Sequence, residues 1–157
     1  MNRDDAREIA TSWTPPQVIR PIAIGLLRHQ GQLLVMRVAD AAGALVGLRP
    51  PGGGVEFGER ADKALRREFR EEFDVAVEII GPPAIFESLF IFNGAPGHEI
   101  TFAFPIASPD LVAKIQGRFV VRELKGDEVA VEWASIARLK TGELSLFPPG
   151  LLAHLGE

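Results

Sequence analysis

Residues 53–75 read GGVEFGERADKALRREFREEFDV, and this stretch carries the strongest structural signal of the chain. At about 100° per residue, its apolar residues gather on one side of a helix over Ala61–Phe73. The basic residues fall on the opposite side of the same helix. The apolar side consists of Ala61, Ala64, Leu65, Phe69 and Phe73, and the basic side of Lys63, Arg66, Arg67 and Arg70. The stretch therefore predicts an amphipathic helix with one buried side.

Three acids of this helix, Glu68, Glu71 and Glu72, lie beside the apolar side rather than among the arginines. Like charges at i,i+3 and i,i+4 destabilise a helix, and the helix dipole disfavours acids near the C-terminal end. A bound divalent cation removes both costs, and hard oxygen ligands suit Mg²⁺ or Mn²⁺. A glutamate-rich helix also produces such a cluster by chance, so the helix alone leaves both interpretations open.

Three consecutive glycines, Gly52 to Gly54, precede the helix. Glycines without side chains let the backbone approach a ligand closely, which favours the metal-site interpretation. Two common phosphate-binding motifs do not fit. The pattern GxxxxGK[ST] fails because Glu59 follows Gly58, and GxGxxG fails because Phe57 takes the place of its last glycine.

Together these residues resemble the Nudix box of the Nudix hydrolases, GX5EX7REUXEEXGU, where U is a bulky aliphatic or similar residue. The matching residues are Gly53, Glu59, Arg67, Glu68, Phe69, Glu71, Glu72 and Val75. Asp74 replaces the last glycine of the box, and Phe69 fills an aliphatic position. Because aspartate tolerates the left-handed backbone conformation better than most residues, we expect only a small stability cost at Asp74.

The resemblance, which covers roughly residues 18–155, implies an α/β (α+β) fold: a Nudix-type α/β/α sandwich with a mixed β-sheet. It implies hydrolysis of the pyrophosphate bond in a nucleoside diphosphate linked to another moiety X, with Mg²⁺ as cofactor and Mn²⁺ as a substitute. The products would be a nucleoside monophosphate and phosphorylated X. The alternative is a non-catalytic Nudix-fold module that binds a nucleotide metabolite or a protein, although such a module has no need for the intact acids.

The resemblance also assigns roles to residues of the box. Glu71, Glu72 and the Gly52 carbonyl would be metal ligands, and Glu68 a ligand or the general base. Arg67 would orient the carboxylates of the catalytic site. Supporting or substrate-binding roles would fall to Glu56, Glu59, Gly53 and Gly54.

Residues outside the box complete the candidate site. Asp127 and Glu128 are candidates for the general base, and Glu99 and Glu123 are weaker ones; the alternative for each is a solvated acid. Arg37 and Arg49 are candidates for phosphate binding, or else surface arginines. Four phenylalanines could stack a base, but alternating aromatics on paired strands more often form a core. These are Phe90, Phe92, Phe102 and Phe104.

Composition narrows the range of partners. The chain has 157 residues, no cysteine, and a net charge of −4 from 17 basic and 21 acidic residues. This balance argues against a nucleic-acid interface and would repel a polyphosphate unless cations bridge the two. No apolar run approaches the roughly 20 residues of a membrane span, and the start of the chain lacks the features of a signal peptide. We therefore expect a cytoplasmic protein with a nucleotide-type substrate and no membrane partner.

We expect one domain over residues 17–157, preceded by an extension over residues 1–16. Within the extension, Asp4–Ala10 is either a short helix or a frayed tail. The resemblance also makes a homodimer an expected state, with the first 14 residues crossing to the partner subunit.

The remaining sequence predicts mostly strands. Pro21 in the first of them suggests an edge position or a bulge. A turn is expected at His29–Gln32, and loops at Ala39–Gly47 and Asn93–His98. The predicted strands are Val18–Leu27, Leu33–Val38, Val75–Ile80, Ala84–Phe92, Glu99–Ala107, Phe119–Leu124 and Val129–Trp133, with helical turns at Ser135–Leu139 and Pro149–Leu155.

Overall fold

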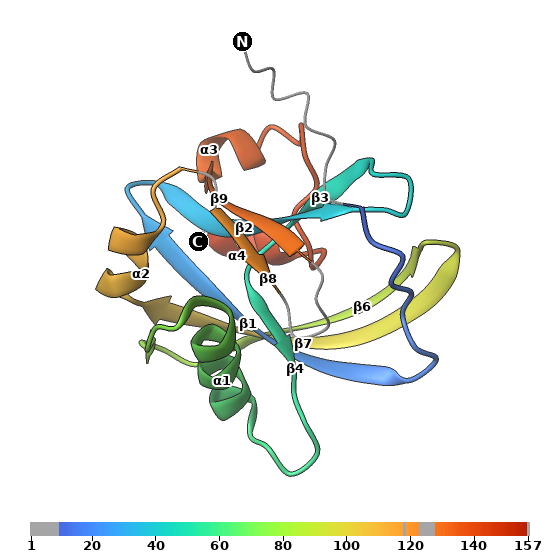
Figure 1. Ribbon diagram of the computed structural model, residues 1–157, viewed down its shortest axis with the longest axis horizontal. Helices are drawn as coiled ribbons and strands as arrows, with labels where there is room; N and C mark the ends of the chain where they lie inside the picture. Colours follow the sequence, from blue (N-terminus) through green and yellow to red (C-terminus); the bar gives the residue numbers. More distant parts are fainter. Residues whose placement is uncertain (1–9, 118, 123–127, 157) are drawn as a thin grey trace.

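Strand β1 joins two β-sheets, and every other element is arranged around it (Figure 1). The computed structural model describes residues 10–117, 119–122 and 128–156. The strands are β1 (Ile19–His29), β2 (Gln32–Ala39), β3 (Leu45–Arg49), β4 (Gly52–Gly54), β5 (Glu78–Ile79), β6 (Ala84–Phe92), β7 (Ala95–Ala107), β8 (Phe119–Arg122) and β9 (Glu128–Ser135). The helices are α1 (Ala61–Phe73), α2 (Pro109–Lys114), α3 (Ile136–Leu139) and α4 (Leu151–Leu155).

The two sheets meet because β1 changes neighbours along its length. Most of β1 runs parallel to β7, which also pairs with β5 and β6. On its other side, β1 pairs antiparallel first with β4 and then, at Arg28 and His29, with β2. Strand β2 continues the second sheet through β3 on one side and β9 and β8 on the other. The sheet is therefore mixed, with one parallel pair at its centre.

The position of β1 corrects the expectation for Pro21. The strand is central rather than at an edge, because β7 pairs along one side and β4 along the other. Pro21 is compatible with this position because the register with β4 begins only at Ile22. At the margin of that pairing, the Pro21 carbonyl still accepts a hydrogen bond from Val55 N–H at 2.9 Å.

Side chains of β1 alternate between two hydrophobic clusters, as the period of a strand requires. Ala23 and Leu27 face the cluster beneath α1, whereas Ile22, Ile24 and Leu26 face the other. The first cluster is covered by α1 and by Leu111 of α2, and the second by buried leucines of α3 and α4. Helices thus lie on both faces of the sheet, which confirms the predicted α/β/α sandwich.

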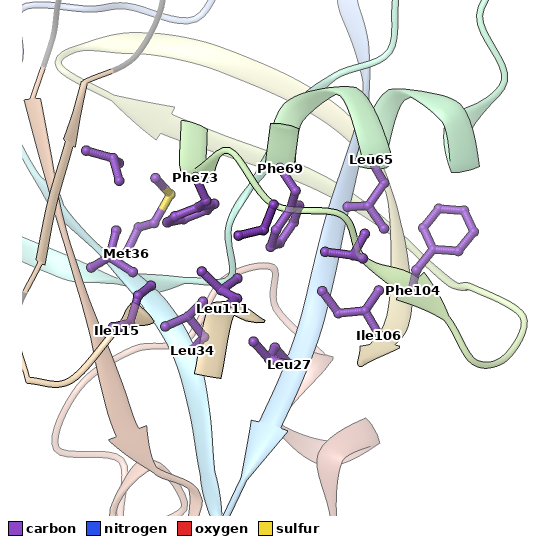
Figure 2. Close-up of a cluster of buried hydrophobic side chains, with 14 of the residues drawn as sticks. Leu27, Leu34, Met36, Leu65, Phe69, Phe73, Phe104, Ile106, Leu111 and Ile115 are labelled. Carbon is purple, nitrogen blue, oxygen red and sulfur yellow. The ribbon is translucent and has the colours of Figure 1, made fainter. Parts of the chain in front are cut away.

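Helix α1 packs closely against the sheet because β1 has a glycine, Gly25, at the point where the helix crosses the strand. A Cβ atom on Gly25 would lie 2.8 Å from the Phe69 ring and 2.7 Å from Ile106 Cδ1. Figure 2 shows Phe69 and Ile106 within the cluster that α1 covers. Phe69 is fully buried, so the aromatic residue at this aliphatic position of the box is a packing variation that Gly25 accommodates.

The structure confirms several predicted elements and corrects others. Helix α1 has the predicted bounds, and the first hairpin turns at Gln30 and Gly31, whose φ angles of 50° and 74° suit a two-residue turn. The second hairpin is tighter than predicted, because Asn93 and Gly94 alone form its turn. The strand predicted over Val75–Ile80 is reduced to Glu78–Ile79. The helix considered for Asp4–Ala10 lies outside the described residues except for its last residue.

Three elements were missed, namely β3, the short β4 and α2. Strand β3 lies partly in the predicted loop, where small residues hid its pairing with β2. Helix α2 was detectable from Ser108-Pro109-Asp110, because the Ser108 hydroxyl accepts from Leu111 N–H and the proline occupies the first turn. No helix in the described ranges is long and apolar enough to cross a membrane.

Gly25→Ala is expected to lower the free energy of unfolding by about 1–3 kcal/mol, because the added methyl group overlaps the Phe69 ring. Urea denaturation measures this loss, and Phe69→Leu in the same chain should recover part of it by making room. If the two substitutions together cost the sum of their separate effects, the methyl group and the ring do not compete for space.

Candidate active site

Helix α1 fixes the position of the acids through its buried side. Ala64, Leu65, Phe69 and Phe73 are buried, and the helix contacts β1, β4 and β8. With that side held against the sheet, the side chains of Glu68 and Glu72 lie at the border between core and surface, and Glu71 lies further out.

Asp74 ends the helix in the predicted conformation. Its φ of 55° and ψ of 43° are left-handed, and its N–H donates to the Arg70 carbonyl oxygen at 3.0 Å. The backbone geometry that the box achieves with glycine is therefore preserved with aspartate.

The glycine strand β4 brings the backbone directly against a carboxylate. Cβ atoms built on Gly53 would lie 2.5 and 2.6 Å from the two carboxylate oxygens of Glu68. A side chain on Gly52 would overlap the backbone of β1 at Ala23 and Ile24. Glycine is thus required at both positions, and the close approach predicted from the sequence exists between β4 and Glu68.

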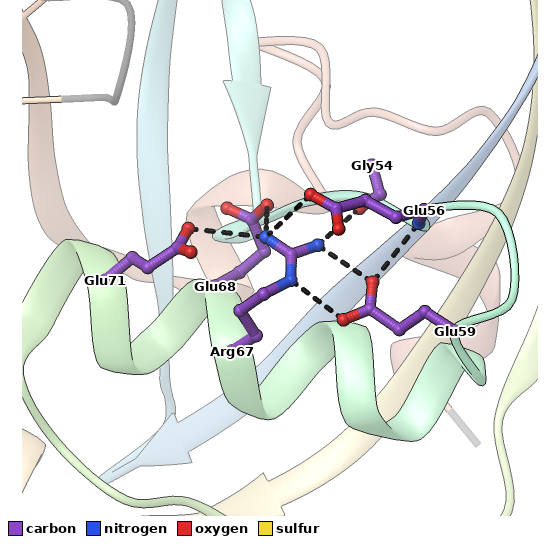
Figure 3. Close-up of polar contacts among 6 residues, drawn as sticks. All are labelled: Gly54, Glu56, Glu59, Arg67, Glu68 and Glu71. Atoms are coloured by element: carbon purple, nitrogen blue, oxygen red, sulfur yellow. Dashed lines mark hydrogen bonds and ion pairs between the residues drawn. The ribbon is translucent and has the colours of Figure 1, made fainter.

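Arg67 lies at the centre of the acidic cluster (Figure 3). Its guanidinium binds Glu59 with two hydrogen bonds, from Nε to Oε2 at 2.8 Å and from Nη2 to Oε1 at 2.9 Å. Nη2 also donates to the Gly54 carbonyl oxygen at 2.9 Å. Nη1 donates to Glu68 Oε1 at 3.0 Å and to Glu71 Oε2 at 3.3 Å, and lies 3.9 Å from Glu56. One side chain therefore connects the preceding loop, β4 and two acids of α1.

These contacts shift the pKa values of both partners. Hydrogen bonds from Arg67 lower the pKa of Glu59 below its ordinary value; desolvation opposes this shift, and the Glu56 N–H, 3.1 Å from Oε1, supports it. The hydrogen bonds with Glu59, followed by those with Glu68, raise the pKa of Arg67. Because both groups stay charged at neutral pH, the Arg67–Glu59 pair is a fixed part of the site.

The donor set fits a hard divalent cation that is shared with a substrate. Glu68 offers carboxylate oxygens beside Gly53, Glu71 and Glu72 follow it on α1, and Oε2 of Glu72 is shielded from solvent. Within the residues that the structure describes, no three acids or histidines converge as a closed metal site. Mg²⁺ does not require one, because proteins usually hold it by one or two carboxylates together with phosphate oxygens and water.

The candidates outside the box lie on other strands. Arg37 of β2 forms an ion pair with Glu132 of β9 at 2.5 Å, and Arg49 ends β3 opposite Met36. Glu132 was missed by the sequence analysis, since an acid between Val131 and Trp133 carries no motif. Glu128 is exposed at the start of β9.

Of the other acids considered as general base, the structure describes only Glu99. Glu99 binds Arg20 at 2.9 Å, between β7 and β1. Asp127 and Glu123 lie outside the described residues.

The four phenylalanines have packing roles in the structure. Phe104 is buried and Phe102 packs against the same cluster beneath α1. The Phe90 ring lies over Gly97, its neighbour across the hairpin, and Phe92 contacts Trp13 with ring centroids 5.9 Å apart. For Phe102 and Phe104 this agrees with the expectation that alternating aromatics on paired strands form a core, whereas Phe90 and Phe92 are half-buried outside the two core clusters.

Comparison with protein families identifies the domain. A model of the NUDIX domain matches residues 16–155, which is most of the chain. Proteins named nucleoside triphosphatase NudI, from Escherichia coli (strain SE11) and Shigella flexneri, are 46% identical over 54 residues. That alignment covers 34% of this chain and 38% of the relatives, so it spans little more than a third of their length.

Solved structures show the same fold. A NUDIX hydrolase from Nitrosomonas europaea has a TM-score of 0.58 at 21% identity, covering 87% of this chain and 85% of that one. A MutT NUDIX hydrolase from Burkholderia pseudomallei has a TM-score of 0.54 at 20% identity, covering 77% and 86%. At these identities the likeness concerns the fold.

Gly53→Ala is expected to lower kcat/KM of the hydrolase activity that we propose for this chain by about 100-fold, because the methyl group would displace the Glu68 carboxylate. Steady-state kinetics measures the loss, and thermal unfolding shows whether the fold is retained. Gly54→Ala is the matched comparison, because a Cβ atom there meets no described atom within 4 Å. Equal losses in the two variants would contradict the contact with Glu68 as the cause.

Glu59→Gln is expected to lower the free energy of unfolding by about 1–2 kcal/mol at pH 7, because it removes one partner of a charged pair. The folded-state pKa of Glu59 lies below its ordinary value of 4.5 because Arg67 donates hydrogen bonds to the carboxylate, so the stabilisation is present above that pH. It is lost as the pH falls through the folded-state pKa.

The free energies of unfolding of the parent protein and of Glu59→Gln should therefore become more similar below pH 4.5. Urea denaturation in the presence of chelator measures both values. Glu143→Gln removes an exposed ion pair with Arg138 and should have little effect at any pH. A difference for Glu59→Gln that is independent of pH would contradict the electrostatic explanation.

Proposed function

The chain belongs to the Nudix family, and on that premise we propose that it is a Mg²⁺-dependent pyrophosphohydrolase. Its substrate would be a nucleoside diphosphate linked to a further moiety X. The observation that carries this proposal is the contact of the Glu68 carboxylate with Gly53, beside Arg67. Acids that serve only solubility are expected to point into solvent, whereas the Glu68 carboxylate lies against the glycine strand β4.

Acids of α1 and one backbone carbonyl of β4 would bind the metal ion. Glu71, Glu72 and the Gly52 carbonyl oxygen would hold Mg²⁺, with Mn²⁺ as a substitute, and Glu68 would be a further ligand or the general base. When bound, the ion would neutralise phosphate oxygens and lower the pKa of a bound water. With a net charge of −4, the chain needs such a cation to bring a polyphosphate to the acids.

The reaction is a displacement at phosphorus. The oxygen of water attacks one phosphorus atom of the pyrophosphate, and the bond from that phosphorus to the bridging oxygen breaks. The bridging oxygen leaves with the other phosphoryl group, and a carboxylate accepts the proton of the water. Glu68 and Glu128 are the candidates for that base, and Arg67 holds Glu68 by a 3.0 Å hydrogen bond. Most of the catalysis then comes from positioning and charge stabilisation.

The names of the relatives favour a first substrate class. Because the aligned relatives are named nucleoside triphosphatases, a nucleoside triphosphate is the first candidate, and the products would be a nucleoside monophosphate and pyrophosphate. Arg37 and Arg49 would contact phosphates of the bound substrate. Since nucleotides are supplied in the cytoplasm, the proposal places the protein there.

Glu72→Gln is expected to reduce metal-dependent turnover by about 100-fold or more, because it removes a charged ligand from the partly buried side of the cluster. Phosphate release is measured with coupled pyrophosphatase and phosphatase. The substrates are nucleoside triphosphates, nucleotide sugars and dinucleoside polyphosphates, each assayed with Mg²⁺, with Mn²⁺ and with chelator.

Glu78→Gln on β5 is the matched control, an exposed glutamate of another element that should leave turnover unchanged. Turnover that survives in Glu72→Gln or in chelator would contradict the proposal. Nucleotide binding by calorimetry without turnover would instead support the non-catalytic module.

A further inference from the structure

A groove opens at the end of β1, where the two sheets separate. Strand β1 pairs with β7 as far as Leu27, which lies opposite Ile106, and from Arg28 onwards it pairs with β2 instead. The strands on its two sides therefore diverge, and side chains fill only part of the space between them. The groove has a volume of about 1010 Å³, which is at the upper end of the range for small-molecule sites. Figure 1 shows α2, which forms one wall, beside this end of β1.

The groove is separate from the candidate active site. Strand β4, which supplies the glycines of that site, pairs with β1 at Ile22–Ile24, whereas the groove begins at Leu26, further along β1. None of the acids of α1 is among the residues that line the groove. A molecule bound there would leave the acids of the box accessible, so binding in the groove is a property distinct from hydrolysis.

The floor of the groove is aliphatic, because the two hydrophobic clusters meet there. Leu27, Ile106 and Ile115 belong to the cluster beneath α1. Leu26 belongs to the cluster on the other face of the sheet. Ile80, which also lines the groove, is 59% exposed. An alkyl chain lying on these side chains would be removed from water, which favours its binding.

The ionisable groups of the groove are basic. Among the described residues that line it, these groups are Arg28, His29 and His154, although acids outnumber lysine and arginine by 21 to 17 in the whole chain. Arg28 is exposed, and its Nη2 donates to the Leu155 carbonyl oxygen at 2.7 Å, which holds the guanidinium beside the end of α4. A guanidinium has five N–H groups and an imidazole has at least one, so donors remain for an anion.

Trp133 of β9 contributes an aromatic wall with a fixed orientation. Its indole N–H donates to the Ile115 carbonyl oxygen at 2.9 Å, which joins β9 to the end of α2. The ring packs against His29, with ring centroids 5.8 Å apart. Because the indole is half-buried and lines the groove, a bound molecule would change its surroundings.

We propose that this groove binds an amphipathic anion, a molecule with an aliphatic chain and one anionic head group. The chain would lie on the aliphatic floor, and the head group, a carboxylate or a phosphate, would accept hydrogen bonds from Arg28 and His154 at the end of α4. Charge distinguishes the groove from the exposed apolar face of β6, because the one charged residue of that strand is Glu87.

Binding of matched probes tests the role of charge. The probes are octanoate and octyl phosphate, and octanol has the same chain without the charge. Both anions should bind saturably and about 10-fold more tightly than octanol, and the tighter anion identifies the head group. Calorimetry on the full chain, in chelator and without nucleotide, measures binding independently of hydrolysis. Trp13→Phe leaves Trp133 as the single tryptophan, whose fluorescence should change with the same affinity.

Arg28→Gln should weaken octanoate binding by about 10-fold and leave octanol binding unchanged, because only the anion uses the guanidinium. Anions that bind no more tightly than octanol, or an equal loss for octanoate and octanol in Arg28→Gln, would overturn the proposal. The absence of saturable anion binding would overturn it as well.

Substitutions on three elements test the location. Ala113 is exposed on α2 and lines the groove, so Ala113→Phe should fill part of it and weaken both anions and octanol by at least about 10-fold. Ala137→Phe is the matched control, because Ala137 is exposed on α3 and does not line the groove. Leu89→Gln removes the 75% exposed leucine of β6 and should leave binding unchanged.

Thermal unfolding confirms that each variant is folded before binding is measured. Undiminished binding in Ala113→Phe, or a comparable loss in Ala137→Phe or Leu89→Gln, would overturn the assignment of the groove.

Discussion

The guanidinium of Arg67 is the contact on which the candidate site depends. It binds Glu59 before α1, Glu68 and Glu71 on α1, and the Gly54 carbonyl of β4. Acids spaced three and four residues apart near the C-terminal end of a helix repel one another and the helix dipole. Arg67 offsets that repulsion from within the same helix, so the acids remain close together without losing the helix. The same contacts attach the helix to the glycine strand and hold it in register with β1.

The glycines have a steric role that complements this electrostatic one. Gly25 admits the Phe69 ring beneath α1, Gly52 lets β4 pair against the backbone of β1, and Gly53 leaves room for the Glu68 carboxylate. These contacts lie along one path from the centre of the sheet to the acidic cluster. A side chain at any of the three positions would push α1 away from the sheet or turn Glu68 aside. The fold and the site therefore share the same close approach between helix and strand.

The local features of the site were predictable from the sequence, and the long-range ones were not. The bounds of α1 follow from its period, and the left-handed Asp74 follows from its place after the last apolar residue. Within the helix, the contact of Arg67 with Glu71 follows from i,i+4 spacing, whereas its contact with the adjacent Glu68 does not, because residues i and i+1 of a helix do not face each other. By contrast, β3 was missed because the small residues that precede it suggested a loop through Gly47, whereas its pairing with β2 is set by contacts distant from any local motif. The pairing of Arg37 with Glu132 depends on the register between β2 and β9, which are 95 residues apart at that contact.

The distances around Arg67 also separate fixed acids from adjustable ones. Glu59 is held by two hydrogen bonds at 2.8 and 2.9 Å and has a lowered pKa, so it forms the permanent counterion of the arginine. Glu68 is held once at 3.0 Å and is confined by Gly53. Glu71 is held by one longer bond of 3.3 Å, and its side chain is 30% exposed. A ligand approaching from solvent would therefore draw Glu71 away first, while Glu59 keeps Arg67, and through it Glu68, in place.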